Sequence, residues 1–467
     1  MRSSSALCAT SLVLALLVFA GAASGQQKTG VCTTIRPATV CANPAGNQLC
    51  PNLPNDVNFK LNLTGYSTLL PECQQPFDDF SWQSFVALNW PLNDLTQPRP
   101  WETYIDPDQI FDPPQLQKMR STLALTAAQN QKVKILYKMA KQHVLPGEPS
   151  TQFLQATGEP LIDRNLNFAL YEERVNPVWA KYVTGHNLNT LGGQAVFISA
   201  KKTVAFPVGH YLDDQKGTGG AVGAMELKAT WRILDPKKDN LQNFYTRKAD
   251  IYMDADHTVN HKPLVVKGVI VGLVALHINT YTTDGKGSVW STFEQEDNAP
   301  PQGKPEPGKT YSFFNPACPA ATCPLNTAPA RIGNEKNYLW GTTAPYAQRY
   351  AYAGQFGTQV TVVNPFYPET EDTNARWHKL MPNTVWTHYR LIGTQWVKGE
   401  VTSAEGIPTY LANSTLETYV PQNQSSCISC HASATLVPSP KPSADLSFLL
   451  SHVPLLRTAN KAAPKSK

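Results

Sequence analysis

The feature that most constrains this chain is the pattern Cys427-Ile428-Ser429-Cys430-His431 near its C-terminal end. Two cysteines three positions apart lie one helical turn apart, so both thiols can add to the two vinyl groups of a single haem. The histidine that follows directly can then reach the iron as its proximal ligand. With 9 Cys and 10 His in 467 residues, random placement would give about 0.004 such patterns per chain. The pattern therefore predicts one covalently bound haem c, with its iron on His431.

Two other uses of a CxxC pair are open from the sequence. Such a pair can form a redox-active or structural disulfide, or supply half of a zinc site. A second close pair, Cys318 and Cys323, leaves a four-cysteine zinc site open. The compartment distinguishes these alternatives, because thioredoxin-type and zinc-ribbon motifs are more typical of cytosolic chains. Haem, in contrast, is attached to CxxCH outside the bacterial cytoplasm.

The first 25 residues are typical of a secretory signal peptide. Arg2 supplies the positive charge, residues 12–20 form a short apolar stretch, and small residues at 21–25 offer a cleavage site. The apolar stretch is shorter than a membrane span requires, and an uncleaved N-terminal anchor is the alternative. No later segment has about 18 uninterrupted apolar residues. We therefore expect a soluble, bacterial, periplasmic or secreted protein without a membrane span in its mature form.

The remaining cysteines are consistent with an oxidising compartment. Cys8 lies in the signal peptide, and two cysteines belong to the motif, which leaves an even number for disulfides. We expect Cys318 and Cys323 to form a local pair in a Pro-rich loop. The other four are expected to pair among themselves, in an order that the sequence leaves open: Cys32, Cys41, Cys50 and Cys73.

Composition limits the partners. The formal net charge is +5 and charged residues make up 16% of the chain. No dense Lys/Arg stripe is present, so the sequence predicts no nucleic-acid partner. A mature length of about 440 residues is large for an electron carrier, and is sufficient for one large core or two modest ones.

Hydrophobic patterns predict a mixed fold. Residues 78–90 are expected to form a helix, because Trp82, Phe85, Val86 and Trp90 recur at helical spacing, and residues 125–143 are expected to form another. Residues 295–330 form a long Pro-rich loop in this interpretation. Segments rich in Val, Ile, Thr and aromatic residues predict strands at 196–206, 224–234, 244–253, 263–280, 288–293 and 383–397.

These patterns indicate an α+β protein with a large antiparallel β-rich core, flanking helices and a C-terminal helical segment that attaches the haem. The expected organisation is a signal peptide at 1–25 and a disulfide-tied, loop-rich segment at 26–75. A β-rich core domain at 76–410 and a haem-attachment segment with a basic tail at 411–467 complete the chain.

The second axial position of the iron is the main open point. No Met follows His431, so the sixth ligand comes from earlier in the chain, from His452, or is missing. Met381 is the first candidate for this metal ligand, with a packing role as the alternative; His378 and His388 come next, together with His452. A saturated iron transfers electrons, whereas an open iron binds small molecules such as peroxide, nitric oxide or hydroxylamine.

A second group of polar residues follows a predicted strand. Glu294, Glu296 and Asp297 place three carboxylates within four residues. One of them is an acid–base candidate near the iron, or the group binds Ca²⁺; the alternative is a solvated strand end. His277 lies on an apolar strand and is expected to be a core histidine with satisfied hydrogen bonds. We assign no catalytic residue from the sequence.

Six stretches spread over most of the chain are informative when taken together: SWQSFVALNWP (81–91), WSTFEQEDNAP (290–300), VWTHYRLIGTQW (385–396), LANSTLETY (411–419), CISCH (427–431) and DLSFLL (445–450). They resemble a family of exported bacterial proteins described only as cytochrome c family proteins. The resemblance implies a single c-type haem on a large exported domain, attached through Cys427, Cys430 and His431. The layout is also similar to that of small β-rich c-type cytochromes that oxidise hydroxylamine or bind nitric oxide, which likewise carry CxxCH near the C-terminus.

The sequence thus leads to three functional hypotheses. The first is an exported mono-haem, cytochrome-like protein that transfers electrons to an unknown redox partner. The second is a haem enzyme of the peroxidase or nitrogen-oxide type, and the third is a haem-based gas sensor; in both, a small molecule binds at the iron. The single CxxCH motif counts against a di-haem peroxidase, which needs two.

Overall fold

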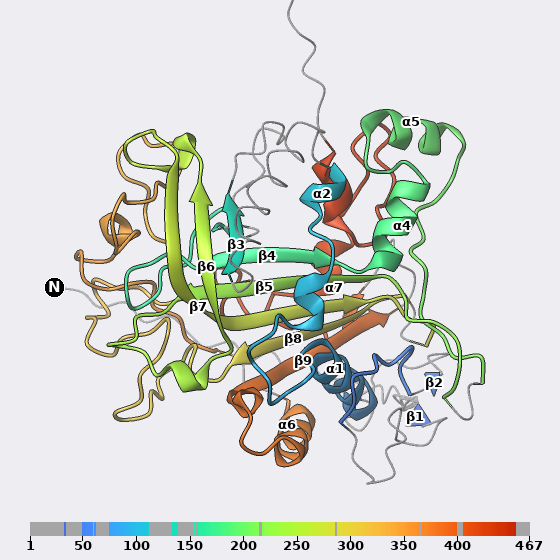
Figure 1. Cartoon of the computed structure of the whole chain (residues 1–467), viewed down its shortest axis with the longest axis horizontal. Coiled ribbons are helices and arrows are strands. Elements are labelled where there is room, and N and C mark those ends of the chain that lie inside the picture. The colour runs from blue at the N-terminus through green and yellow to red at the C-terminus, as the bar shows by residue number, and fades with distance from the viewer. Residues whose placement is uncertain are drawn as a thin grey trace, which may run out of the picture.

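A computed structural model of the chain describes residues 32–33, 49–58, 60–61, 74–111, 133–138, 153–155, 157–213, 217–284, 287–363, 367–398 and 405–453. Within these ranges, a curled sheet runs through the molecule, with helices α1 (Gln74–Leu88) and α6 (Pro368–Leu380) along its lower side in Figure 1. Helices α4 (Pro177–Gly185) and α5 (Leu191–Ser199) lie near one end of the sheet. The expected signal peptide, residues 1–25, falls outside the described residues.

Eight of the described strands form this sheet, in the order β10-β9-β8-β7-β5-β4, with β6 and β3 continuing it beside β7. All neighbours are antiparallel except β3 and β6, which are parallel. A separate two-stranded sheet pairs β1 (Cys32–Thr33) with β2 (Lys60–Leu61). The strands of the large sheet are β3 (Val133–Lys138), β4 (Leu170–Val175), β5 (Met225–Ile233), β6 (Thr246–Met253), β7 (Leu264–Thr280), β8 (Val289–Gln295), β9 (Tyr389–Lys398) and β10 (Glu405–Ile407).

The curl of the sheet is centred on β7, which spans 17 residues. One edge of β7 pairs with β5, and the other edge pairs first with β6 and then with β8. At Gly272, β7 is paired on both edges at once: with Arg232 of β5 on one edge and with Thr246 of β6 on the other. A Cβ atom at Gly272 would lie 2.7 Å from Leu234 Cδ1. Glycine therefore permits the close packing on which this turn of the sheet depends.

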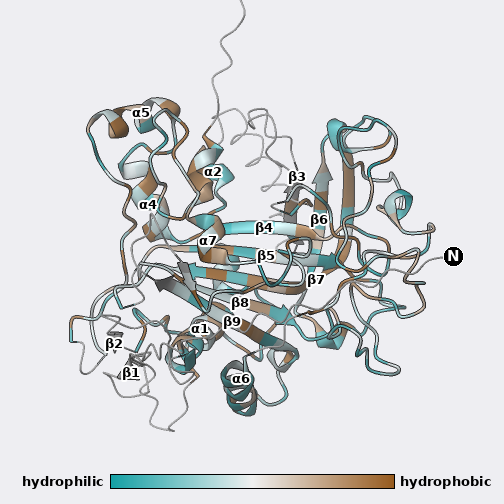
Figure 2. Cartoon of the chain, turned by 180° about the vertical axis from the view of Figure 1, so that it is seen from behind, coloured by the Kyte–Doolittle hydropathy of each residue, from teal (hydrophilic) through white to brown (hydrophobic). Residues whose placement is uncertain are grey.

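Two further short helices complete the helical part of the described chain: α2 (Asp108–Phe111) and α7 (Cys427–His431). Most of α6 is hydrophilic in Figure 2, and its buried residues, Thr370, Thr373, Asn374 and Trp377, leave the rest of the helix to solvent. No helix in the described ranges combines the length and apolar character needed to cross a bilayer. The 3₁₀ helices are Pro100–Thr103, Leu241–Asn243, Ala255–His257, Gln348–Tyr350, Val385–His388 and Phe448–His452.

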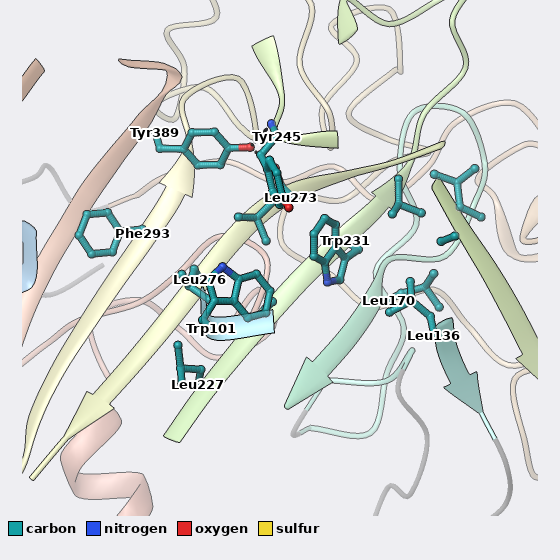
Figure 3. Packing of buried hydrophobic residues seen from close by; sticks show 14 of the residues in the cluster. Trp101, Leu136, Leu170, Leu227, Trp231, Tyr245, Leu273, Leu276, Phe293 and Tyr389 are labelled. Carbon is teal, nitrogen blue, oxygen red and sulfur yellow. Dashed lines mark hydrogen bonds between the residues drawn. The ribbon is translucent and has the colours of Figure 1, made fainter. Parts of the chain in front are cut away.

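The sheet has two unlike faces because neighbouring residues of a strand point to opposite sides. One side, here called the core face, carries Leu227, Leu276 and Phe293, which belong to the largest apolar cluster. Figure 3 shows Trp101 lying together with Leu227 and Leu276 in this cluster. The α1 helix covers the same face, where Phe85 stacks on Phe293 with ring centroids 4.3 Å apart.

The other side, here called the motif face, carries a row of registered polar residues. Lys228 pairs with His277, and His277 pairs with Thr292. In the next row of the same face, Trp290 pairs with Gln395. Directly paired side chains point to the same side of a sheet, so these residues share one face.

Several sequence predictions are confirmed. The helix expected at 78–90 is α1 (Gln74–Leu88), and four expected strands are β5, β6, β7 and β8, within a few residues of their predicted ends. The strand expected at 383–397 begins later, at Tyr389, after a 3₁₀ turn. The α+β class with a mostly antiparallel sheet is therefore correct.

Two element predictions are wrong. The strand expected at 196–206 is replaced by α5 (Leu191–Ser199), which begins because the Thr190 hydroxyl accepts a hydrogen bond from the Gly193 N–H at 3.0 Å. The sequence pattern predicts a helix at 125–143. The structure describes residues 133–138 of this segment, and they form strand β3 (Val133–Lys138), which pairs with β6. Pairing with a distant strand here overrides the local helical pattern.

Candidate functional site

The CxxCH motif forms one helical turn. Helix α7 spans Cys427–His431, and the side chain of Ser426 caps its start by accepting a hydrogen bond from the Ser429 N–H at 3.2 Å. Cys427 is buried, Cys430 is exposed, and both are free thiols. The spacing thus gives the one-turn separation that two thioether bonds to a single haem require.

A buried glutamine fixes this turn to the sheet. Gln395 on β9 is fully buried, and its Oε1 accepts a hydrogen bond from the Ile428 N–H at 2.9 Å. Its Nε2 donates to the Pro408 carbonyl at 2.6 Å and to Ser426 Oγ at 3.1 Å. One side chain therefore holds both the start of α7 and the loop before it, which places the motif over the motif face.

The histidine of the motif has a defined tautomer. His431 Nδ1 lies 2.8 Å from the Leu446 carbonyl oxygen, which can only accept, so Nδ1 carries the proton. Its ring packs against Trp290 and Phe448, with centroids 4.2 and 5.0 Å away. Burial lowers the pKa of His431 to about 4, and the positive charge of Lys228 acts in the same direction. The imidazole is therefore neutral at physiological pH, with its lone pair on Nε2.

His277 lies next to this site on the motif face. It is buried, as expected, but its Nε2 has no hydrogen-bond partner among the described residues. Glu417 Oε2 lies 3.7 Å from this nitrogen, beyond hydrogen-bonding distance. Burial lowers the pKa of His277 to about 3, and the charges of Lys228 and His431 contribute to the same shift. The prediction of a core histidine with satisfied hydrogen bonds is thus only partly met.

Glu417 is the acidic residue of this site, and the sequence analysis did not single it out. Its Oε2 accepts a hydrogen bond from the Asn413 N–H at 2.9 Å, and Asn413 Nδ2 donates to Thr292 Oγ1 at 2.9 Å. Burial raises the pKa of Glu417 to about 7. Burial raises the thiol pKa values of Cys427 and Cys430, and the charge of Glu417 raises them further. The residues around Glu417 in the sequence form no pattern that distinguishes it from an ordinary solvent-exposed acid. Its position in the site is therefore seen only in the folded structure.

Three of the four sixth-ligand candidates, Met381, His378 and His388, make other contacts in the structure. Met381 is buried in the apolar cluster of the core face, on the opposite side of the sheet from the motif. His378 contacts Trp82 of that cluster and lies 2.7 Å from the Tyr389 carbonyl. His388 Nδ1 lies 2.7 Å from Glu296. The structure therefore does not bring Met381 or His378 together with His431.

The three carboxylates at the C-terminal end of β8 and just beyond it, Glu294, Glu296 and Asp297, have different partners. Glu294 is buried and accepts a hydrogen bond from the Ser414 N–H. Glu296 pairs with His388, and Asp297 pairs with Lys309 at 3.1 Å. Within the described part of the chain, no group of three or more His, Cys, Asp or Glu side chains is arranged to hold a metal ion.

The second close cysteine pair is a disulfide. Cys318 and Cys323 are bonded to each other, as expected from the sequence. Cys50 is also disulfide-bonded. A four-cysteine zinc site needs four thiolates, so Cys318 and Cys323 in their bonded state cannot complete one with the motif cysteines.

No protein-family model, no curated protein and no solved structure matches this chain. Two free thiols on one helical turn, a neutral histidine with Nε2 available, and the rings of Trp290 and Phe448 beside it fit the requirements of a covalently bound haem.

Proposed function

We propose that this protein is an exported mono-haem cytochrome-like protein, periplasmic or secreted, with a redox function. Cys427 and Cys430 would hold the haem through thioether bonds, and His431 would coordinate its iron. The observation that carries the proposal is the hydrogen bond from His431 Nδ1 to the Leu446 carbonyl, which leaves Nε2 unprotonated one residue after the second cysteine. When bound, the haem would supply one-electron redox chemistry and an iron coordination position.

The chain's own residues prepare the site in three ways. Gln395 holds the start of the motif helix through its hydrogen bonds to Ile428 and Ser426. The Leu446 carbonyl orients the His431 ring and increases its basicity as a ligand, as outer-shell partners of metal-bound histidines do. The Trp290 ring packs on the imidazole, restricts its rotation and excludes water from it.

An alternative within the same proposal is a haem that binds or converts a small molecule. The observation that favours it is the location of Met381 and His378 on the core face. With these two candidates on the other side of the sheet, the ionisable residues whose charges act on the motif include Glu417, and His277 lies 3.7 Å from Glu417. A polar environment of this kind is typical of haem sites that bind ligands.

Intact mass and visible spectroscopy test the proposed function. The chain is produced in a bacterium that has the haem-attachment machinery, and we expect a coloured protein with a mass increase of roughly 616 Da, the mass of one haem. The double variant Cys427→Ser/Cys430→Ser is expected to be colourless. The control Cys318→Ser/Cys323→Ser removes an equal number of cysteines and is expected to keep the pigment. A colourless wild-type protein would refute the proposal.

A further inference from the structure

We propose that Glu417, supported by His277, forms a recognition site beside the haem that favours small neutral or cationic ligands with N–H or O–H groups over anions. This inference rests on the proposed function, because it concerns what binds next to a haem attached at Cys427 and Cys430. The additional claim is the chemical class of the ligand, with Glu417 as the residue that selects this class.

The first argument is the position of Glu417. The side chains of its neighbours Leu416 and Thr418 are buried, whereas the side chain of Glu417 keeps 26% of its surface accessible. Its charge acts on both motif thiols. A haem bonded to these thiols would therefore lie within reach of the charge of Glu417, and part of the Glu417 side chain is accessible to a ligand.

The second argument is that Glu417 is held in place. Its Oε2 accepts the Asn413 N–H, and the Asn413 side chain is bonded to Thr292 on the motif face. Asn413 Nδ2 also donates to the Phe293 carbonyl at 3.2 Å. A carboxylate fixed in this way keeps its remaining lone pairs in a defined direction, as a selective acceptor must.

The third argument is a pair of buried polar atoms that lack hydrogen bonds. His277, with 7% of its side chain exposed, has an unpartnered Nε2 that lies 3.7 Å from Glu417 Oε2. Trp290 Nε1, on the same face, is likewise unpartnered among the described residues. Buried polar atoms in native proteins are nearly always hydrogen-bonded. Two such atoms beside the motif indicate that a polar molecule, or a polar group of one, completes this site.

The fourth argument is charge. The negative charge of Glu294 raises the pKa of Glu417, and the positive charge of Lys228 lowers it. Lys228 itself pairs with Glu173 at 3.5 Å. A carboxylate can accept hydrogen bonds but cannot donate them, so it stabilises ligands that bring their own N–H or O–H groups and repels anions.

Ligand binding to the purified, haem-loaded protein tests this inference. Imidazole, which is neutral and carries an N–H, and azide, an anion, are titrated into the ferric protein at pH 8.5, and the shift of the Soret band is followed. Glu417 ionises with a pKa of about 7, so it is charged under these conditions. Glu417→Gln keeps the shape and the acceptor for the Asn413 N–H but removes the charge. We expect the ratio of azide to imidazole affinity to rise at least tenfold in this variant.

The matched control is Glu296→Gln, the same substitution in a carboxylate that pairs with His388. Its affinity ratio is expected to stay within twofold of wild type. An unchanged ratio in Glu417→Gln, an equal rise in both variants, or a wild-type haem that binds neither ligand would overturn the inference. In each of these outcomes the haem is still present, so the proposed function stands. A protein without haem would instead refute the proposed function itself.

Discussion

The imidazole of His431 lies against the indole of Trp290, with ring centroids 4.2 Å apart and planes inclined by 51°. This contact joins the CxxCH helix to strand β8. Trp290 is 6% exposed, and it belongs to a small apolar cluster with Ile392, Leu411 and Ile428. The motif therefore rests on the sheet through one aromatic contact and through the hydrogen bonds of Gln395.

Truncation of Trp290 is expected to weaken this attachment. Trp290→Ala removes a buried aromatic side chain, which typically costs about 3–5 kcal/mol of unfolding free energy. Urea denaturation measures the loss. Trp290→Phe, which keeps a ring against His431, is expected to cost less than half as much. Equal costs for the two variants would show that ring packing does not hold the motif.

Gln395 is expected to matter for both stability and haem attachment. Gln395→Ala leaves the Ile428 N–H and the Pro408 carbonyl without their buried partner, at about 1–3 kcal/mol for each group. A loosened motif helix should also lower the fraction of chains that carry haem, which intact mass measures. Gln424→Ala, at an exposed position, is the control and should match wild type in both measurements.

Met381 provides a test of the two sheet faces. Because Met381 is buried in the core-face cluster, Met381→Ala is expected to lower the unfolding free energy by about 2–5 kcal/mol. The visible spectrum of the folded, haem-loaded variant should match that of wild type. A change in the low-spin bands would instead return Met381 to its place as the sixth ligand.

A buried carboxyl between α1 and the sheet predicts a pH dependence of stability. Burial raises the pKa of Asp78 to about 7, although Gln74 and Thr370 donate hydrogen bonds to it at 2.8 and 2.7 Å. The folded state therefore binds a proton that the unfolded state has already released above pH 4. Stability due to this group is complete below pH 4 and declines as the pH rises towards 7.

Asp78→Asn should reduce this decline, as measured by urea denaturation between pH 4 and 8. Part of the decline will remain, because burial also raises the pKa of Glu226 and of Glu417 to about 7. A profile for Asp78→Asn as steep as that of wild type would contradict the assignment.

The sequence predicts helices and strands correctly where the local hydrophobic pattern alone determines the secondary structure. The spacing in α1 places Trp82 and Phe85 on one side of a helix, and that side is the one packed against the sheet. The alternating or continuous apolar character of β5 and β7 likewise predicts strands. The local disulfide between Cys318 and Cys323 follows from their proximity in the chain.

The predictions failed where a partner distant in sequence decides the outcome. Residues 133–138 have a helical pattern but pair with β6, more than 100 positions later. The surroundings of Met381 also depend on distant packing: it is buried in the core-face cluster, and its role as the sixth ligand stays a prediction that the spectrum of Met381→Ala tests. Spacing along the chain carries no information about which face of a sheet a loop residue reaches.

The CxxCH pattern alone predicts the chemistry expected at the C-terminal end, because two thiols and an imidazole within five residues can serve one haem when the segment forms a helical turn. The surroundings depend on the fold. Gln395, Glu417 and Leu446 come from three separate segments, and their contacts with the motif exist only because the sheet and the chain after β10 bring those segments together. The spacing of residues along the chain determines which groups are neighbours over a few positions. Hydrogen bonds and charge interactions also join groups far apart in sequence, which come together only when the chain folds.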